Sequence, residues 1–217
     1  MKKRNISLKL ASLFITILMI SCSDDGPDYV DELDVVYTNY DSSFDFSTTT
    51  TYALPDRVIE VTGENIGDTD FDEDVDYVDP VYGDPILAGI KENMDAFGWQ
   101  EVDESSNPDV IILPTAMDTV NLYYYYDWGY WGWYYPGWGP GWGWYYPGYY
   151  PPIISGYRSG TILLQMTYPS GIGVNDNIPV LWTGAINGLL EGSTSSIQTR
   201  IENTVDQVFK QSQYLNK

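Results

Sequence analysis

The chain has 217 residues, 31 acidic and 10 basic, so its formal net charge is −21; it contains one cysteine and no histidine. This charge argues against nucleic-acid binding, whose affinity comes largely from lysine and arginine on phosphates. Without histidine the chain lacks the commonest general base and metal ligand, which argues against Ser/His or Cys/His nucleophiles and against zinc, copper or haem sites. A lone cysteine has no disulfide partner.

The N-terminus predicts export and lipid attachment. Four basic side chains open the chain: Lys2, Lys3, Arg4 and Lys9. The apolar run over residues 10–20 suits a signal peptide and is shorter than the roughly 20 residues of a transmembrane helix. Met19-Ile20-Ser21-Cys22 resembles the lipobox of bacterial lipoproteins, although a small residue is usual where Ile20 stands. We therefore expect residues 1–21 to be a lipoprotein signal peptide and Cys22 to carry a membrane anchor; an ordinary signal peptide with a chance cysteine is the alternative.

Residues 22–32 are expected to form an acidic tether between the lipid and the domain. The tether begins with Ser23-Asp24-Asp25, which resembles the acidic signal that sends some Gram-negative lipoproteins to the outer face of the outer membrane. This favours an outer-membrane lipoprotein at the cell surface, with an anchor facing the periplasm as the alternative. Loss of residues 1–21 would remove four basic residues and no acid, giving a mature chain with a net charge of −25.

A single domain over residues 33–217 is expected to follow, and it begins with two strands. Residues 33–40 are rich in β-branched and aromatic residues. Residues 49–54 are dense in threonine and tyrosine, and this second strand is expected to resume at residues 58–61 after Pro55.

The first insertion, residues 63–84, is strongly acidic. Its alternating aspartates could ligate calcium through oxygen: Asp70, Asp72, Asp74 and Asp76. An EF-hand loop started at Asp68 would place Glu73 where the turn needs glycine, so that motif fails. A solvated acidic loop is therefore the favoured interpretation.

A helix and a central strand come next. Asp84 is expected to cap the helix, with Pro85 in its first turn and Gly98 at its end. The apolar residues of this helix recur at helical spacing and predict a core-facing stripe: Ile86, Ile90, Met94 and Phe97. Residues 110–113 are apolar on both faces, which is typical of a central strand.

The second insertion, residues 122–152, is named the aromatic segment below. Between residues 123 and 150, 17 of 28 positions are tryptophan or tyrosine, and glycine and proline fill most gaps. The segment lies between two predicted strands, so we expect it to be the loop of a long hairpin. Three interpretations stay open: a mobile low-complexity loop, a binding platform, or a loop that dips into the membrane interface. The candidate binding residues are Trp128, Trp131, Trp133, Trp138, Trp142, Trp144, Tyr145 and Tyr146.

Two strands, residues 160–167 and 180–186, and a helix complete the domain. Ser195 with Gln198 predicts a capping box at the start of this helix. Its apolar stripe is expected to be core: Ile197, Ile201, Val205, Val208 and Phe209. The order of elements predicts an α+β two-layer sandwich, with a mostly antiparallel sheet of about five strands and both helices packed on one face.

Several motifs, in this order, resemble the lipoprotein family known as domain of unknown function 4136 (DUF4136), over about residues 33–214. They comprise residues 34–41, 46–47 and 51–53, Gly98-Trp99, Pro108-Asp109-Val110, Gly160-Thr161, Leu181-Trp182-Thr183-Gly184 and the closing helix. Gln165-Met166-Thr167-Tyr168 departs from the family, which often has an aspartate near this point. The resemblance implies a lipid-anchored envelope domain and no particular activity.

From these observations we predict a non-catalytic binding or structural protein of the cell envelope that needs no cofactor. Its partners would be the membrane, through Cys22, and a glycan, peptidoglycan or envelope protein, through the aromatic segment. A passive spacer is the main alternative. A carboxylate-dependent hydrolase is the least favoured, because 31 acids make a chance pair of carboxylates easy to find.

Overall fold

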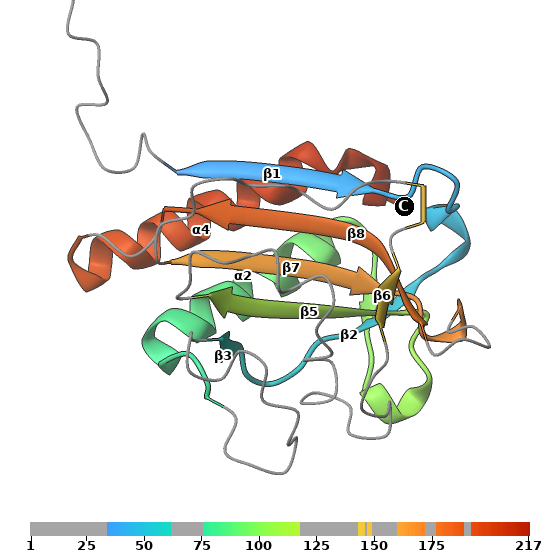
Figure 1. Cartoon of the computed structure of the whole chain (residues 1–217), viewed down its shortest axis with the longest axis horizontal. Helices are drawn as coiled ribbons and strands as arrows, with labels where there is room; N and C mark the ends of the chain where they lie inside the picture. Colours follow the sequence, from blue (N-terminus) through green and yellow to red (C-terminus); the bar gives the residue numbers. More distant parts are fainter. Residues whose placement is uncertain are drawn as a thin grey trace, which may run out of the picture.

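The computed structural model describes residues 34–61, 76–117, 143–145, 147–148, 160–171, 177–188 and 192–217. These residues form an α+β domain in which two helices lie over one face of a mixed β-sheet (Figure 1). The predicted fold class is therefore confirmed, while the strand count and the strand directions differ in part from the expectation.

Four strands form the antiparallel part of the sheet, in the order β1 (Val35–Tyr40), β8 (Asn177–Asn187), β7 (Thr161–Thr167) and β5 (Val110–Met117). Each corresponds to a predicted strand: β1 and β7 start within the predicted ranges, and both β5 and β8 extend past the residues that the sequence indicated. Every residue of β7 is buried, as expected for a strand covered on both faces.

On its other side, β5 pairs with two short parallel strands, β2 (Thr51–Ala53) and β3 (Ile59–Val61). The second predicted strand therefore does resume after Pro55. β2 also pairs in parallel with β4 (Gln100–Glu101), a two-residue strand with exposed side chains that the sequence did not predict. The sheet is mixed and has more strands than expected, because hydrophobic patterning shows where strands form but not the direction in which they pair.

The two helices, α2 (Pro80–Ala96) and α4 (Thr194–Gln211), pack against each other over the sheet. A Cβ atom added to Gly89 of α2 would lie 3.0 Å from Cγ1 of Val205 of α4, so the glycine allows this close approach. Asn93 of α2 also donates a 2.8 Å hydrogen bond to Asp206 of α4. Both predicted apolar stripes lie in or against the hydrophobic core.

Helix α2 begins before the predicted start at Asp84-Pro85. Asp79 is its N-cap, accepting a 2.9 Å hydrogen bond from the Val81 N–H, and Pro80 occupies the first turn. The prediction was wrong because two Asp-Pro pairs stand five positions apart and either could open a helix. The helix thus includes the last residues of the predicted acidic insertion.

Pro85 instead lies inside α2, where it cannot donate the helical hydrogen bond to the Val81 carbonyl. Nε2 of Gln198, on α4, donates to that carbonyl at 2.9 Å. The predicted capping box of Ser195 and Gln198 is therefore wrong. Ser193 caps α4 by accepting a hydrogen bond from a backbone N–H, and Gln198 bonds across to α2.

The remaining described elements are short. β6 (Gly143–Tyr145) lies within the aromatic segment and pairs in parallel with the start of β8. Short 3-10 turns occur at Phe46–Thr48, Glu104–Ser106, Pro169–Gly171 and Gln213–Leu215.

Candidate functional site

The residues expected to carry the lipid and the export signal, Cys22 and Ser23-Asp24-Asp25, lie outside the described residues. Within the described ranges, no helix is both long enough and apolar enough to cross a membrane. The described chain starts at Asp34, the second residue of the predicted domain, and this residue is firmly held. Nε and Nη2 of Arg200 donate to its carboxylate at 2.7 and 2.5 Å, and both side chains are almost fully buried.

The weak calcium candidates are only partly described. Asp70, Asp72 and Asp74 lie outside the described residues, whereas Asp76 is exposed and its carbonyl accepts a 2.8 Å hydrogen bond from the Glu60 N–H. Among described residues, no group of three or more acidic or cysteine side chains is arranged to hold a metal ion. The four aspartates therefore stay an untested prediction.

The aromatic segment is attached to the sheet through β6, which lies in its C-terminal half. Of its eight candidate residues, six lie outside the described part: Trp128, Trp131, Trp133, Trp138, Trp142 and Tyr146. The other two, Trp144 and Tyr145, belong to β6, where Trp144 pairs with Ile178 of β8 and Tyr145 pairs with Pro179. The sequence missed this strand because its pairing partner lies more than 30 positions away and glycine and proline interrupt any strand periodicity.

A turn after β6 adds a second contact. Gly148 has φ of +72°, a backbone conformation that favours glycine. A Cβ atom added there would lie 3.2 Å from Oδ1 of Asp41, the buried residue that follows β1. The same carboxylate oxygen accepts hydrogen bonds from the N–H and hydroxyl of Ser43, at 2.8 and 2.6 Å. This turn is thus held against the ends of β1 and β8.

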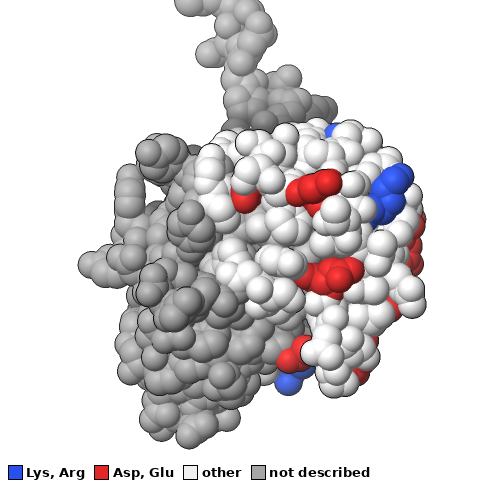
Figure 2. All heavy atoms as spheres, turned by 90° about the vertical axis from the view of Figure 1, so that its right-hand side faces the viewer, with Lys and Arg blue, Asp and Glu red and all other residues white. Residues whose placement is uncertain are grey.

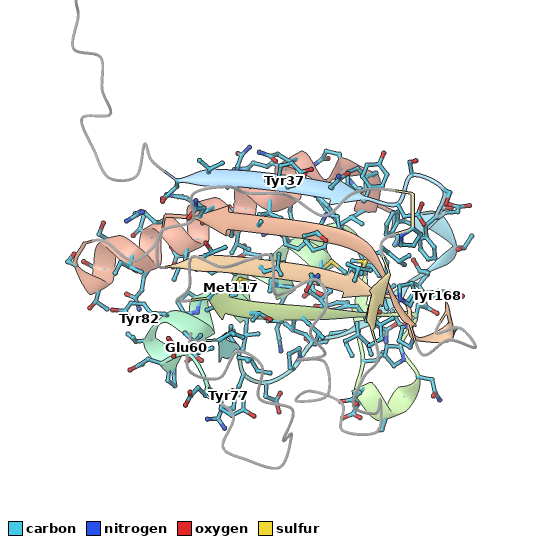
Figure 3. All side chains as sticks on the ribbon, viewed as in Figure 1. Tyr37, Glu60, Tyr77, Tyr82, Met117 and Tyr168 are labelled. Carbon is cyan, nitrogen blue, oxygen red and sulfur yellow. The ribbon has the colours of Figure 1, made fainter. Side chains whose placement is uncertain are left out.

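The attachment points of the segment lie at opposite ends of the sheet. The segment leaves β5 after Met117 and returns before Thr161, and these two residues pair in the antiparallel ladder, which confirms the predicted hairpin. Thr167, six residues or about 20 Å further along β7, pairs with β8 near the β6 contact. Figure 3 shows Met117 and Tyr168 at these two ends. β6, within the segment, therefore pairs at the end of the sheet opposite to Met117 and Thr161.

The sheet face turned away from α2 and α4, named the second face, is buried as well. Its residues alternate with those that contact the helices and include Ile111, Leu113, Leu163, Gln165, Thr183 and Ala185. None of these is more than 4% exposed, although both described helices lie on the opposite face. Both faces of the central strands are therefore buried.

The motifs that resemble the DUF4136 family have structural roles. Trp182 is fully buried, and its Nε1 donates to the Ser212 hydroxyl at 2.9 Å. Trp99 Nε1 donates to the Leu215 carbonyl at 2.8 Å, so both indoles fasten the C-terminal turn. Oδ2 of Asp109 accepts hydrogen bonds from the N–H groups of Thr50 and Thr51, at 2.7 and 2.9 Å, and ties β2 to β5.

Acidic side chains are scattered over the described surface at the end of the sheet where β6 lies, and basic ones are fewer (Figure 2). Glu101 forms a partly exposed ion pair with Lys91, at 2.8 Å. Hydrogen bonds from the Ser105 hydroxyl and N–H lower the pKa of Asp103, whereas burial and then the Asp103 charge raise the pKa of Glu104. Asp103 and Glu104 belong to one surface turn, directly after β4.

Lys217 has a strongly shifted pKa. Its Nζ donates to the Phe46 carbonyl and lies 3.4 Å from the centre of the Trp99 ring. Burial lowers its pKa to about 8, against the opposing effect of Asp109 and Asp45. The contacts tie the C-terminus to the core and serve its packing.

Two hollows lie outside the predicted site. A groove of about 640 Å³ runs between β1 and α4, named the β1–α4 groove, and polar side chains of α4 line it. A smaller pocket of about 210 Å³ lies between the helices and the edge of the sheet, and Glu60, Tyr82 and Met117 border it (Figure 3). The sequence did not predict either hollow, although Ser195, Thr199, Asn203 and Gln207 recur every four residues along α4.

A family model described as "Domain of unknown function (DUF4136)" matches residues 36–212, from β1 to the end of α4. The chain is similar to the crystal structure of a DUF4136 family protein from Bacteroides thetaiotaomicron, with 30% identity and a TM-score of 0.62; the match covers 84% of this chain and 97% of that chain. No curated protein matches the sequence.

Two further solved structures resemble the chain weakly. They are a PelC dodecamer from Paraburkholderia phytofirmans, at 8% identity and a TM-score of 0.36, and a PDZ domain protein from Parabacteroides distasonis, at 14% and 0.37. The matches cover 81% and 80% of this chain, and 96% and 36% of the respective structures. Both likenesses are too weak to indicate a shared role or assembly.

Proposed function

The chain belongs to the DUF4136 family, and from this premise we propose that it is a lipid-anchored, non-catalytic protein of the cell envelope that binds a glycan through its aromatic segment. The family name assigns no activity, so the proposal rests on the sequence of the N-terminus and on the way the sheet holds the segment. A domain that faces the periplasm would meet peptidoglycan and one that faces the medium would meet an environmental glycan, and purified peptidoglycan is the first ligand to test.

The way in which the aromatic segment is held carries the proposal. β6 and Gly148 hold its C-terminal half at one end of the sheet, and β5 and β7 hold its two ends at the other. Restraining a loop before it binds lowers the entropy lost on binding. Rings of tyrosine and tryptophan offer large flat surfaces with a polar group, and the C–H face of a sugar can stack on them.

Removing two rings tests the contact. We expect Trp138→Ala with Trp142→Ala to reduce sedimentation of the protein with purified peptidoglycan by about tenfold, since each stacked ring is worth about 0.5–1.5 kcal/mol. The matched control, Trp138→Tyr with Trp142→Tyr, keeps flat rings and should retain most of the binding. The thermal midpoint of all three proteins should agree within a few degrees.

Two outcomes would contradict this proposal. If the alanine pair unfolds the domain, the rings belong to the core and do not form a contact surface. If the alanine pair binds peptidoglycan as well as the parent does, the segment is a passive spacer or contacts a protein instead.

The proposed location has its own test. Protease added to intact cells, followed by detection of the C-terminal helix, should remove the protein if it faces the medium. Loss of signal without lysis would support Ser23-Asp24-Asp25 as a surface-export signal. Protection until the outer membrane is broken would place the domain in the periplasm and contradict surface exposure.

A further inference from the structure

Among the described residues, the outer edge of β1 has backbone groups that no strand pairs with. The Asp41 N–H donates to the Leu181 carbonyl at 2.8 Å, so these two residues form a hydrogen-bonded pair. Because hydrogen-bonded and non-hydrogen-bonded pairs alternate along an antiparallel ladder, every second residue of β1, counted back from Asp41, bonds to β8. Val36, Thr38 and Tyr40 therefore direct their N–H and C=O groups away from β8. No described strand pairs with this edge. The Tyr40 N–H is occupied, because it donates to Oδ1 of Asn39 at 2.9 Å.

The opposite edge of the sheet is guarded in ways that β1 is not. There β4 is two residues long and carries Glu101, and an antiparallel bridge to Tyr77 covers Ile59 of β3. Natural sheets commonly protect their edges with charges, proline, short strands or a covering segment. β1 has six residues, VVYTNY, without a charge or a proline. It is therefore the long unguarded edge of the described sheet.

The surface beside this edge is also free of net charge. Exposed hydroxyl and amide side chains of α4 line the β1–α4 groove: Ser195, Ser196, Thr199, Asn203 and Gln207. The two charged residues of the groove, Asp34 and Arg200, neutralise each other. A chain with a net charge of −21 repels its own copies over most of its surface. An uncharged strand beside an uncharged helix flank is where two such chains could meet.

We propose that β1 pairs antiparallel with β1 of a second copy, around a twofold axis at Tyr37. In this register Val36 of one copy lies opposite Thr38 of the other. Each such pair exchanges two hydrogen bonds between the backbone N–H and C=O groups that point away from β8. A register shifted to an axis at Thr38 would need the Tyr40 N–H, which Asn39 already occupies. The two sheets become continuous, and the polar flanks of the two α4 helices face each other.

The pairing also covers the apolar side chains left exposed on β1. Val35 is 53% exposed and Tyr37 36%. Figure 3 shows Tyr37 on the outermost strand. Around the proposed axis the two Tyr37 rings lie opposite each other in a non-hydrogen-bonded pair, which brings side chains closest, and Val35 lies opposite Asn39. The dimer therefore shields the two most exposed side chains of the edge.

Single cysteines in the full chain test this register in cells. The Cα atoms of a non-hydrogen-bonded pair are about 4.5 Å apart, within disulfide range, so Tyr37→Cys should give a covalent dimer under a mild oxidant. Val35→Cys is the matched control. In the proposed register Val35 lies opposite Asn39, so the two cysteines at position 35 would be four positions, or about 13 Å, apart along the strands. We expect a product of twice the chain mass for Tyr37→Cys and none for Val35→Cys or the parent chain.

Other crosslinking results would overturn the proposal. They are no product from Tyr37→Cys, equal products from both variants, or a product whose mass differs from twice the chain. The last result would assign the edge to a different protein.

Sedimentation of the full chain in detergent gives an independent reading. The parent should be a dimer, and Tyr37→Glu should be a monomer with an unchanged circular dichroism spectrum, because like charges would face each other across the axis. Val81→Glu, an exposed apolar position on α2, should remain dimeric. A monomeric parent or a dimeric Tyr37→Glu would refute the pairing. No glycan enters either assay, so the result is independent of the proposed function.

Discussion

Gly184 marks the point on β8 over which helix α4 passes. A Cβ atom at this position would lie 2.6 Å from Cγ1 of Val208 and 3.3 Å from the Trp182 ring. Real side chains essentially never approach so closely, so the helix or the indole would have to move. The glycine of the Leu181–Gly184 motif is thus explained by the contact between helix and sheet.

We expect Gly184→Ala to lower the free energy of unfolding by about 1–3 kcal/mol through overpacking, as measured by urea denaturation. Gly83→Ala is the matched control, because its Cβ would meet nothing closer than 3.6 Å and alanine is the better helix former. A Gly184→Ala variant as stable as the parent would show that α4 can shift away at no cost.

Asp109 gives a prediction about pH. Burial raises the pKa of its carboxyl, but hydrogen bonds from Thr50 and Thr51 outweigh this and hold the pKa below its usual range. A carboxyl with a depressed folded-state pKa stabilises the fold above its unfolded pKa of about 3.9, and this contribution disappears as the pH falls through the lower folded-state value.

Asp109→Asn should therefore lower the free energy of unfolding by on the order of 1 kcal/mol at pH 7, and this difference from the parent should shrink below about pH 4. Chemical denaturation of both proteins between pH 2.5 and 7 measures the difference, in conditions where the parent stays folded. A cost that is the same at every pH would show that the charge of Asp109 is not involved.

At the scale of elements, the contact between Pro85 of α2 and Gln198 of α4 shows one helix completing another. The proline removes the donor for the Val81 carbonyl, and Gln198 supplies a replacement at 2.9 Å. The position of the proline can be read from the sequence. Its compensation depends on how α2 and α4 lie side by side.

A double-mutant cycle tests this compensation. Gln198→Ala should lower the free energy of unfolding of the parent by about 0.5–1.5 kcal/mol, because the Val81 carbonyl then loses its donor. The same change should cost less when Pro85→Ala is already present, since the new N–H at position 85 can bond Val81 within the helix. Denaturation of the four proteins gives the coupling energy. Strictly additive effects would contradict the proposed link.

At the scale of the whole molecule, the buried ion pair of Asp34 and Arg200 joins the start of the domain to its last helix. Nη2 of Arg200 also donates to the Gly188 carbonyl, directly after β8. The pair therefore fixes β1, the end of β8 and α4 at the point where the chain enters the domain.

We expect Asp34→Ala to lower the free energy of unfolding by about 3–5 kcal/mol, because it leaves the buried guanidinium without its counter-charge. Adding Arg200→Met should restore much of this loss by removing the unpaired charge. Thermal and urea unfolding of the single and double variants measure both effects. A mild effect of Asp34→Ala alone would mean that water reaches Arg200.

The sequence by itself determined which segments form the central strands and both helices, because apolar residues at a period of two or 3.6 must be buried on one face whatever their partners are. It also placed the aromatic segment between β5 and β7, since that position follows from chain order. Composition and the N-terminal motif were enough to predict an exported, acidic protein without histidine chemistry.

Only the tertiary structure decided the features that depend on residues far apart in the chain. These are the parallel pairing of β2 and β3 with β5 and the ion pair between Asp34 and Arg200. The pairing of β6 with β8, which fixes the aromatic segment, is of the same kind. Patterns within one segment record burial, but a partner across the fold leaves no local pattern, so packing alone selects among such pairings.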